Sequence, residues 1–140
     1  MSKPRVLFVC EGNRARSQVA EALLRFHAGD RFDVHSAGIR PGVGLPDFTA
    51  RTLDEIGVPY DGQHGKHFSE FEGETFDWVI TVCDYVRDED PPLPYGERLH
   101  WSVEDPGDMQ VRGLSIDEAM REVRSDLQAR IAQFIARPDL

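Results

Sequence analysis

The sequence predicts an α/β fold, in which a single doubly wound parallel sheet of about four strands carries helices on both faces. Short apolar runs alternate along the chain with segments whose apolar residues recur at helical spacing. The run from Trp78 to Val82 is almost continuously apolar, which is typical of a strand buried on both faces of a parallel sheet. A length of 140 residues fits one domain, and we expect residues 1–140 to form it.

The first two elements are a strand and a helix joined by a tight loop. The apolar run from Val6 to Val9 predicts a strand that ends at Cys10. The segment from Ser17 to about His27 is expected to be an amphipathic helix, because its apolar residues recur at near-helical spacing. These residues are Val19, Ala20, Leu23, Leu24 and Phe26. The start of this helix is then expected to lie against the loop.

A second strand and a second helix follow. Residues 32–36 are expected to form a short strand, and a loop rich in glycine and proline covers residues 38–46. From Pro46 onward, Phe48, Leu53 and Ile56 mark a helix, and Gly57 is placed as its C-terminal stop.

The last part of the chain supplies two more strands and a long helix. Cys83 lies at the end of the strand over residues 78–82, and residues 98–101 are expected to form the last strand. Ser115 and Glu118 have the spacing of a capping box, which predicts the start of the final helix. The apolar stripe of that helix, which is expected to pack in the core, consists of Ile116, Met120, Val123, Leu127, Ile131 and Phe134.

Composition and charge argue against several classes of function. A net charge of -9 argues against nucleic acid or an anionic membrane as a partner, since both bind basic surfaces. No apolar run approaches the roughly 20 residues of a membrane helix and no signal-peptide pattern is present, so we expect a cytoplasmic protein. Two cysteines are too few for a disulfide scaffold, and in a reducing compartment such thiols are reactive or buried.

The segment from Cys10 to Ser17 predicts an anion-binding loop with a nucleophile. Between a strand end and a helix start, backbone N–H groups converge on one point, the helix N-terminus adds partial positive charge, and Arg16 can bind two oxygens at once. Gly12 and Asn13 both tolerate the left-handed backbone region. The same field favours the thiolate of Cys10. We therefore expect Cys10 to attack an oxyanion held by Glu11, Gly12, Asn13, Arg14, Ala15 and Arg16.

Two further residues are candidates for chemistry. Ser17 can donate a hydrogen bond to the sulfur, and it can also cap the helix, because both contacts use the first turn. Asp105 precedes Pro106 in what reads as an irregular loop. A partly desolvated carboxylic acid at this position can protonate a departing oxygen.

On these motifs the chain resembles the low-molecular-weight tyrosine phosphatase superfamily, and within it the thioredoxin-coupled arsenate reductases. The resembling stretches are Cys10–Glu21 (CEGNRARSQVAE), Ser36–Gly38, Thr81–Asp84 and His100–Trp101 through Asp105–Pro106. The loop of Cys, five residues, Arg and Ser is common to the phosphatases and the reductases. The resemblance implies a low-molecular-weight phosphatase-like version of the α/β fold, and no cofactor is expected.

The helix start from Ser17 to Glu21 and the position of Cys83 favour the reductase. In that family, the resemblance implies, the first thiolate attacks arsenate, and a second cysteine then attacks the first sulfur, which expels arsenite and leaves a disulfide. Cys10 and Cys83 would take these two roles in arsenic resistance. The bridge requires their Cα atoms to come within roughly 7 Å. The alternative for Cys83 is a buried core thiol.

The residues beside the acid also favour a small oxyanion. Asp105 and Pro106 are followed by Gly107 and Asp108, whereas the tyrosine phosphatases that the chain resembles have aromatic residues there to line a phenol ring.

The chain departs from the reductase pattern at Asp90. The reductases that it resembles carry a third cysteine there, followed by proline, and this chain has Asp90 and Pro91. A disulfide between Cys10 and Cys83 would then be reduced by an external thiol, namely thioredoxin, glutaredoxin or a low-molecular-weight thiol. Otherwise the reductase activity has been lost and only phosphate ester hydrolysis remains.

A second departure concerns a potassium site that some relatives build near the positions of Asn13, Glu21 and Ser36. Lys66 is expected to lie there, where its ammonium group can replace the cation, so no metal is expected. His64 and His67 are expected to be surface or loop residues, and not ligands.

Three functions stay open at this point. The first is a cytoplasmic arsenate reductase, and the second is a phosphatase that acts on tyrosine-phosphorylated protein or on a small ester. The third, from another class, is a catalytically idle anion-binding module.

Overall fold

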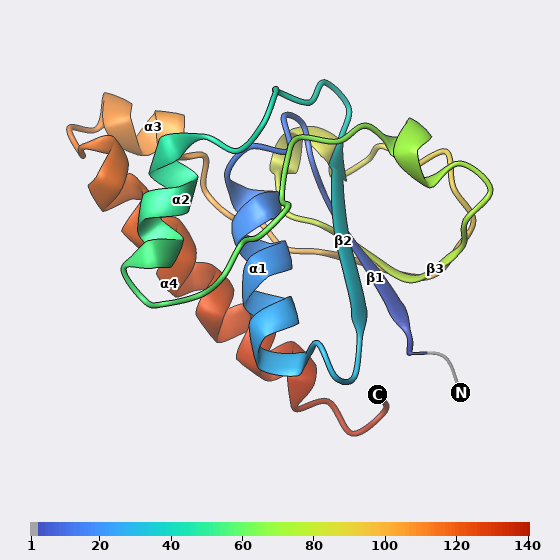
Figure 1. The fold of residues 1–140 in the computed structure, drawn as a ribbon. Helices are drawn as coiled ribbons and strands as arrows, with labels where there is room; N and C mark the ends of the chain where they lie inside the picture. The colour runs from blue at the N-terminus through green and yellow to red at the C-terminus, as the bar shows by residue number, and fades with distance from the viewer. Residues whose placement is uncertain (1–2) are drawn as a thin grey trace.

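The computed structural model describes residues 3–140 of the chain (Figure 1). Its strands are β1 (Arg5–Cys10), β2 (Asp33–Gly38), β3 (Phe76–Thr81) and β4 (Tyr95–His100). Its α-helices are α1 (Arg16–Ala28), α2 (Asp47–Asp54), α3 (Pro106–Val111) and α4 (Ile116–Ile135). Two short 3-10 helices, η1 (Phe68–Phe71) and η2 (Asp84–Val86), follow α2 and β3.

The four strands form one parallel sheet in the order β2-β1-β3-β4. The central strands β1 and β3 pair with Val9 opposite Thr81, and Cys10 lies opposite Gly38 of β2. Because parallel strands all end at the same edge of a sheet, the residues that follow them are brought together there. Cys10, Gly38, Thr81 and His100 mark this edge.

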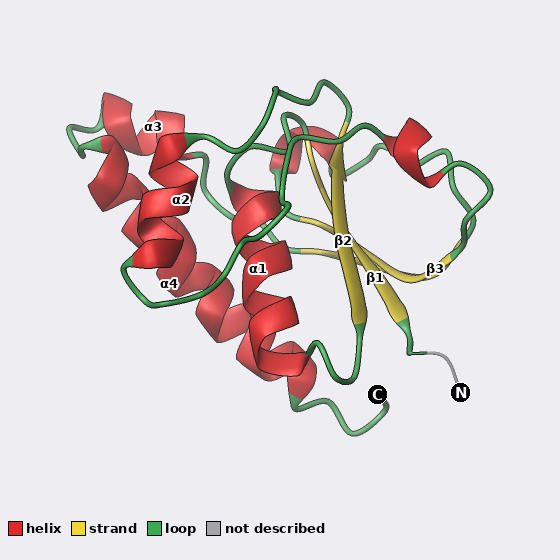
Figure 2. Ribbon diagram, in the orientation of Figure 1, coloured by secondary structure: helices red, strands yellow, loops and turns green. Residues whose placement is uncertain are grey.

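Helical segments cover both faces of the sheet, which confirms the predicted fold class. All four α-helices lie on one side, and η1 lies on the other with long connections (Figures 1 and 2). Glycines interrupt the segment over residues 57–73, and three prolines occur between residues 91 and 94. Because glycine and proline disfavour α-helix, these two connections form only 3-10 turns on their way to β3 and β4.

Several predicted elements differ from the structure in extent. The second and last strands run over residues 33–38 and 95–100, and the strand over 78–82 begins two residues earlier, at Phe76. Asp105 lies in the loop after β4, as predicted, but the irregular structure expected to continue through Gly107 was wrong, because α3 begins at Pro106. Asp105 is the N-cap of α3 and accepts a hydrogen bond from Gly107 N–H (2.8 Å). Proline at the first position of a helix costs no hydrogen bond, which explains how Asp-Pro starts one here.

The core is one cluster of buried apolar side chains, to which the sheet, the α-helices and the 3-10 helices all contribute, the last through Phe68, Phe71 and Val86. Of the predicted stripe on α4, five residues are buried, and Ile116 is only partly buried. Phe26 of α1 was expected on the apolar face, yet its side chain is 52% exposed. The capping box of Ser115 and Glu118 is present as predicted. Among residues 3–140, no helix combines the length and the apolar composition needed to cross a membrane.

A charged clamp fastens the end of α2 to α4. Glu55, directly after α2, accepts hydrogen bonds from Arg121 Nη2 (2.6 Å) and Arg124 Nη1 (2.8 Å). Hydrogen bonds lower the pKa of Glu55 from its ordinary value of 4.5 to about 2, with the larger contribution from Arg121 and the smaller one from Arg124. Since the folded state holds the carboxylate form, this clamp stabilises the fold at neutral pH.

Replacing Glu55 with glutamine is expected to lower the melting temperature at neutral pH, because both arginines lose their charged partner. The difference between wild type and Glu55→Gln is expected to shrink as the pH falls from about 5 toward about 2, where the wild-type carboxylate is protonated as well. Thermal unfolding followed by circular dichroism across this range checks it. Glu122→Gln, which replaces an exposed glutamate of α4, is the control. If the difference in melting temperature between wild type and Glu55→Gln does not change with pH, the proposed clamp is contradicted.

Candidate active site

The loop between β1 and α1 turns sharply around the Cys10 sulfur. Asn13 adopts a left-handed backbone with φ of 47°, the one non-glycine residue with positive φ among residues 3–140. This turn directs the Asn13 N–H at Cys10 Sγ, 3.1 Å away. Gly38 of β2 lies so close that a Cβ there would be 2.7 Å from the carbonyl oxygen of Glu11, so a larger residue does not fit. The predicted loop is therefore present, and the end of β2 supports it.

The Cys10 thiol is almost fully buried among hydrogen-bond donors. Ser17 Oγ lies 2.8 Å from the sulfur, and Ser17 Oγ itself accepts a hydrogen bond from Asn13 Nδ2 (2.8 Å). Ser17 makes the predicted contact with the sulfur, but it does not cap α1, whose N-cap is Ala15. Donors of this kind stabilise sulfur in its anionic form.

The loop presents free N–H groups where an oxyanion would bind. The carbonyl oxygens of Glu11 and Gly12 accept hydrogen bonds from residues 40 and 42. The backbone N–H groups of Gly12, Arg14 and Ala15 have no partner within residues 3–140. Unpaired N–H groups beside a helix N-terminus form an anion-binding concavity.

Arg16 and Asp105 form a charged pair at the rim of the loop. The guanidinium of Arg16 donates a hydrogen bond to the carbonyl of Val103 (3.1 Å) and lies 3.8 Å from the Asp105 carboxylate. The Asp105 side chain is about half exposed, so it is only partly desolvated. The site thus holds a cation, Arg16, directly beside an acid, Asp105, and both residues line the same cavity as Cys10.

These groups line a cavity of about 510 Å³. Of the residues predicted to act on substrate, the cavity contains Cys10, Glu11, Gly12, Arg14, Ala15, Arg16 and Asp105. Asn13 and Ser17 lie buried behind the loop and contact the sulfur from that side. The other residues that line the cavity, which were not predicted from the sequence, are Phe48, Pro106, Gly107, Gln110 and Ile116. Phe48 and Ile116 followed helical core patterns, and no local feature of the sequence distinguishes a cavity wall from a core.

Cys83 lies beside the loop, two residues after β3. The hydrogen bond from Val82 N–H to Val9 O (2.9 Å) continues the parallel pairing, so that Val82 comes beside Cys10. Strand spacing and chain geometry then put the Cα atoms of Cys10 and Cys83 roughly 6 Å apart. Both cysteines are free thiols and both are buried.

The Cys83 side chain lines a second cavity of about 380 Å³. This cavity shares Glu11, Arg16 and Asp105 with the first one, so the two cavities are adjacent. The next residue, Asp84, connects the chain after β3 to the end of β4 through hydrogen bonds with His100 and Ser102. Hydrogen bonds from His100 and Ser102 lower the pKa of Asp84 below its ordinary value.

Asp90, at the place of the expected third cysteine, is exposed and accepts a hydrogen bond from the Tyr95 hydroxyl (2.6 Å). Cys10 and Cys83 thus follow neighbouring strands of the sheet, their side chains line different cavities, and residues 3–140 contain no third thiol.

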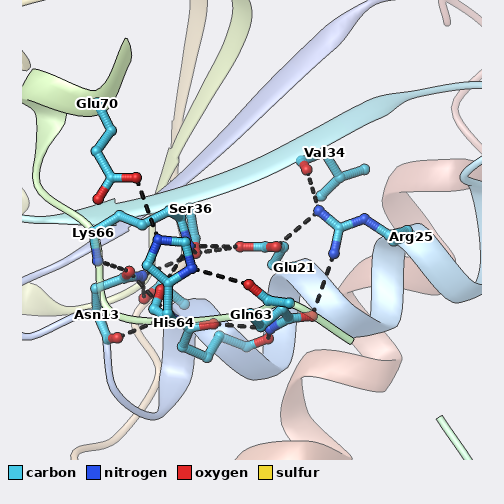
Figure 3. A network of polar contacts seen from close by, with 12 residues as sticks. Asn13, Glu21, Arg25, Val34, Ser36, Gln63, His64, Lys66 and Glu70 are labelled. Carbon is cyan, nitrogen blue, oxygen red and sulfur yellow. Dashed lines mark hydrogen bonds and ion pairs between the residues drawn. The ribbon is translucent and has the colours of Figure 1, made fainter. Parts of the chain in front are cut away.

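Behind the loop, Lys66 reaches the residues expected around it (Figure 3). Its Nζ lies 3.4 Å from Glu21 Oε1, 3.2 Å from Ser36 Oγ and 2.9 Å from the carbonyl oxygen of His64. The expectation that no metal binds here stays a prediction. The rings of His64 and His67 are exposed and bond only within their own loop and η1.

The chain is similar in sequence and in structure to proteins described as arsenate reductases. The chain is 32% identical over 135 residues to an arsenate reductase of Halalkalibacterium halodurans, covering 96% of both chains. A solved structure described as an arsenate reductase in the reduced state superposes with a TM-score of 0.73 at 28% identity, over 95% of this chain and 97% of that one. The thioredoxin-dependent arsenate reductase Cg_ArsC1' of Corynebacterium glutamicum superposes with a TM-score of 0.66 at 29% identity, over 95% of this chain and 60% of that one.

The family description that matches the sequence, over residues 5–138, is "Low molecular weight phosphotyrosine protein phosphatase". With its loop of Cys10 to Arg16 at the end of β1 in a parallel four-stranded sheet, the chain belongs to the low-molecular-weight phosphotyrosine protein phosphatase family.

Proposed function

We propose that this protein is an enzyme that reduces arsenate to arsenite, with Cys10 as nucleophile and Cys83 as resolving thiol. The observation that carries the proposal is a second free, buried thiol just after β3, the strand that pairs with β1. Ideal strand spacing gives a Cα separation of roughly 6 Å for the two cysteines, which a disulfide can span. The arsenate reductases among its relatives support the same reaction.

In the first step, arsenate binds against the free N–H groups of the loop and the guanidinium of Arg16. The Cys10 thiolate attacks arsenic, and a sulfur–arsenic bond forms. One arsenate oxygen departs as water after Asp105 supplies a proton. The distance of 3.8 Å between Arg16 and Asp105 places the acid beside the group that holds the oxyanion.

In the second step, the Cys83 thiolate attacks Cys10 Sγ. A disulfide forms, the sulfur–arsenic bond breaks, and its electron pair stays on arsenic, which is reduced from the +5 to the +3 state. Cys83 has extended dihedral angles (φ -141°, ψ 128°), and side chains alternate along an extended chain, so the Cys83 side chain faces the second cavity and not Cys10. This side chain therefore has to turn toward Cys10 before it can attack. Until then, the hydroxyl of Ser17 stabilises the Cys10 sulfur.

The disulfide is returned to two thiols by an external reductant, because Asp90 occupies the place of a third cysteine. Two reductant thiols are oxidised to one disulfide in each cycle. Thioredoxin, glutaredoxin and a low-molecular-weight thiol all satisfy this balance, and one relative is described as thioredoxin-dependent. Such a cycle requires a reducing compartment, so the proposal places the protein in the cytoplasm.

Hydrolysis of phosphate esters is the second candidate reaction, and one residue that lines the cavity, Phe48, favours it. Phe48 gives the cavity an aromatic side chain that a phenol ring can pack against, although none lies beside the acid in the sequence. In this reaction Cys10 attacks phosphorus, Asp105 protonates the ester oxygen, and water hydrolyses the phosphocysteine. Cys83 has no role in it.

Cys83→Ser is expected to abolish steady-state arsenate reduction, because no thiol remains to break the sulfur–arsenic bond. Hydrolysis of p-nitrophenyl phosphate, which needs one thiol only, is expected to persist in this variant, and Cys10→Ser loses both reactions. The measurement compares arsenate-dependent thiol consumption with p-nitrophenol release in all three proteins. Wild-type rates of arsenate reduction in Cys83→Ser would remove the resolving role.

Asp105→Asn is expected to lower kcat for p-nitrophenyl phosphate by about 10²–10⁴-fold, the usual effect of losing a general acid. KM is expected to change little, because Arg16 and the loop still bind the phosphate. Asp108→Asn is the matched control, since it removes a carboxylate from the same helix without a contact to Arg16. Equal losses in the two variants would mean that only the charge of α3 matters.

A further inference from the structure

Gln18 is a fully buried polar residue to which the reaction assigns no role. It lies in the first turn of α1, directly after Ser17. Its Nε2 lies 3.0 Å from the carbonyl oxygen of Asn13, 3.0 Å from Asn13 Oδ1 and 2.8 Å from the carbonyl oxygen of His64. Two of these acceptors are backbone carbonyls, which only accept hydrogen bonds. They fix the orientation of the Gln18 amide, with its NH₂ group toward Asn13.

The neighbouring loop supports the same orientation. Gln63 Nε2 donates to Gln18 Oε1 (2.8 Å) and to the Gln18 carbonyl oxygen (3.1 Å). Arg25, whose guanidinium only donates hydrogen bonds, lies 3.4 Å from Gln63 Oε1, so the oxygen of Gln63 faces Arg25 (Figure 3). The nitrogen of Gln63 therefore faces Gln18. Donors therefore point along the chain of residues from Arg25 through Gln63 to Gln18.

The amide of Asn13 is oriented by its own neighbours. Its Oδ1 accepts hydrogen bonds from Gln18 Nε2 and from the backbone N–H of Lys66 (2.9 Å). Its Nδ2 must then face the other way, where it donates to Ser17 Oγ (2.8 Å) and Ser36 Oγ (2.9 Å). Because Ser17 Oγ accepts from Asn13, the hydroxyl proton of Ser17 is left for Cys10 Sγ.

We infer that Gln18 is a positioning residue that acts on the Cys10 sulfur through Asn13. Its bond to the Asn13 carbonyl holds the left-handed turn that aims the Asn13 N–H at the sulfur. Its bond to Asn13 Oδ1 sets the amide so that the Ser17 hydroxyl donates to the sulfur. The inference rests on the proposed role of Cys10 as nucleophile, and it adds a residue that touches neither substrate nor sulfur.

The test is the pH dependence of Cys10 alkylation by iodoacetamide, measured in a Cys83→Ser background so that one thiol reacts. Gln18→Leu is expected to move the alkylation midpoint upward by about one pH unit and to weaken binding of inorganic phosphate about tenfold, the effect of weakened hydrogen bonds to a charged group. Gln18→Met, a flexible chain of similar length without donors, is the second variant in case leucine is not accommodated.

Two controls separate positioning from loss of stability. Ile131→Val lowers stability from a buried site on α4, and it is expected to leave the alkylation profile unchanged. Gln63→Leu removes the support of Gln18 but none of its bonds to Asn13, so a smaller shift is expected. If both Gln18 variants behave like Ile131→Val, the inference is overturned.

A double substitution tests the route through Asn13. Glycine adopts the left-handed backbone without cost but has no side-chain amide, so Asn13→Gly removes the contact of Gln18 with Asn13 Oδ1 and keeps its bond to the backbone carbonyl. Gln18→Leu is therefore expected to move the alkylation midpoint less in the Asn13→Gly protein than in the protein with Asn13, and additive shifts would overturn the inference. Neither alkylation nor phosphate binding requires arsenate turnover, so failure of the proposed function is recognised separately.

Discussion

The left-handed backbone at Asn13 is the constraint on which the site depends. A non-glycine residue in this region costs about 1–2 kcal/mol, and here buried hydrogen bonds to the Asn13 side chain and carbonyl offset that cost. The turn aims one N–H at the Cys10 sulfur and leaves the N–H groups that follow it open to an oxyanion. Without this turn, the chain would pass Cys10 as an ordinary strand-to-helix connection.

The parallel sheet supplies the rest of the site by bringing strand ends to one edge. β1 ends at Cys10, β3 ends two residues before Cys83, and β4 leads through residues 101–104 to Asp105. The overall charge of -9 repels anions at long range. Binding therefore depends on a local reversal of sign, which open N–H groups, the start of α1 and the guanidinium of Arg16 provide.

The same loop serves two reactions in this family, so the surroundings of Cys10 decide between them. Reduction requires a second sulfur that can attack the first, and in the proposed reaction Cys83, which follows the strand paired with β1, supplies it. Ester hydrolysis requires room for a leaving group, and Phe48 lines such room from α2. Both reactions need an acid, and the N-cap of α3 positions Asp105 for that role.

The fold class, the loop of Cys10 to Arg16 and the capped final helix could be predicted from the sequence, because apolar periodicity, loop residues and a capping box act over short stretches of chain. The sequence did not reveal α3, the contribution of Phe48 and Ile116 to the cavity, the hydrogen bonds from Gln18 to Asn13 or those from Gln63 to Gln18. These depend on contacts between residues far apart in the chain, such as Gln18 with His64. They became visible in the three-dimensional structure alone, because periodicity marks a residue as apolar or buried without showing which distant residue it contacts.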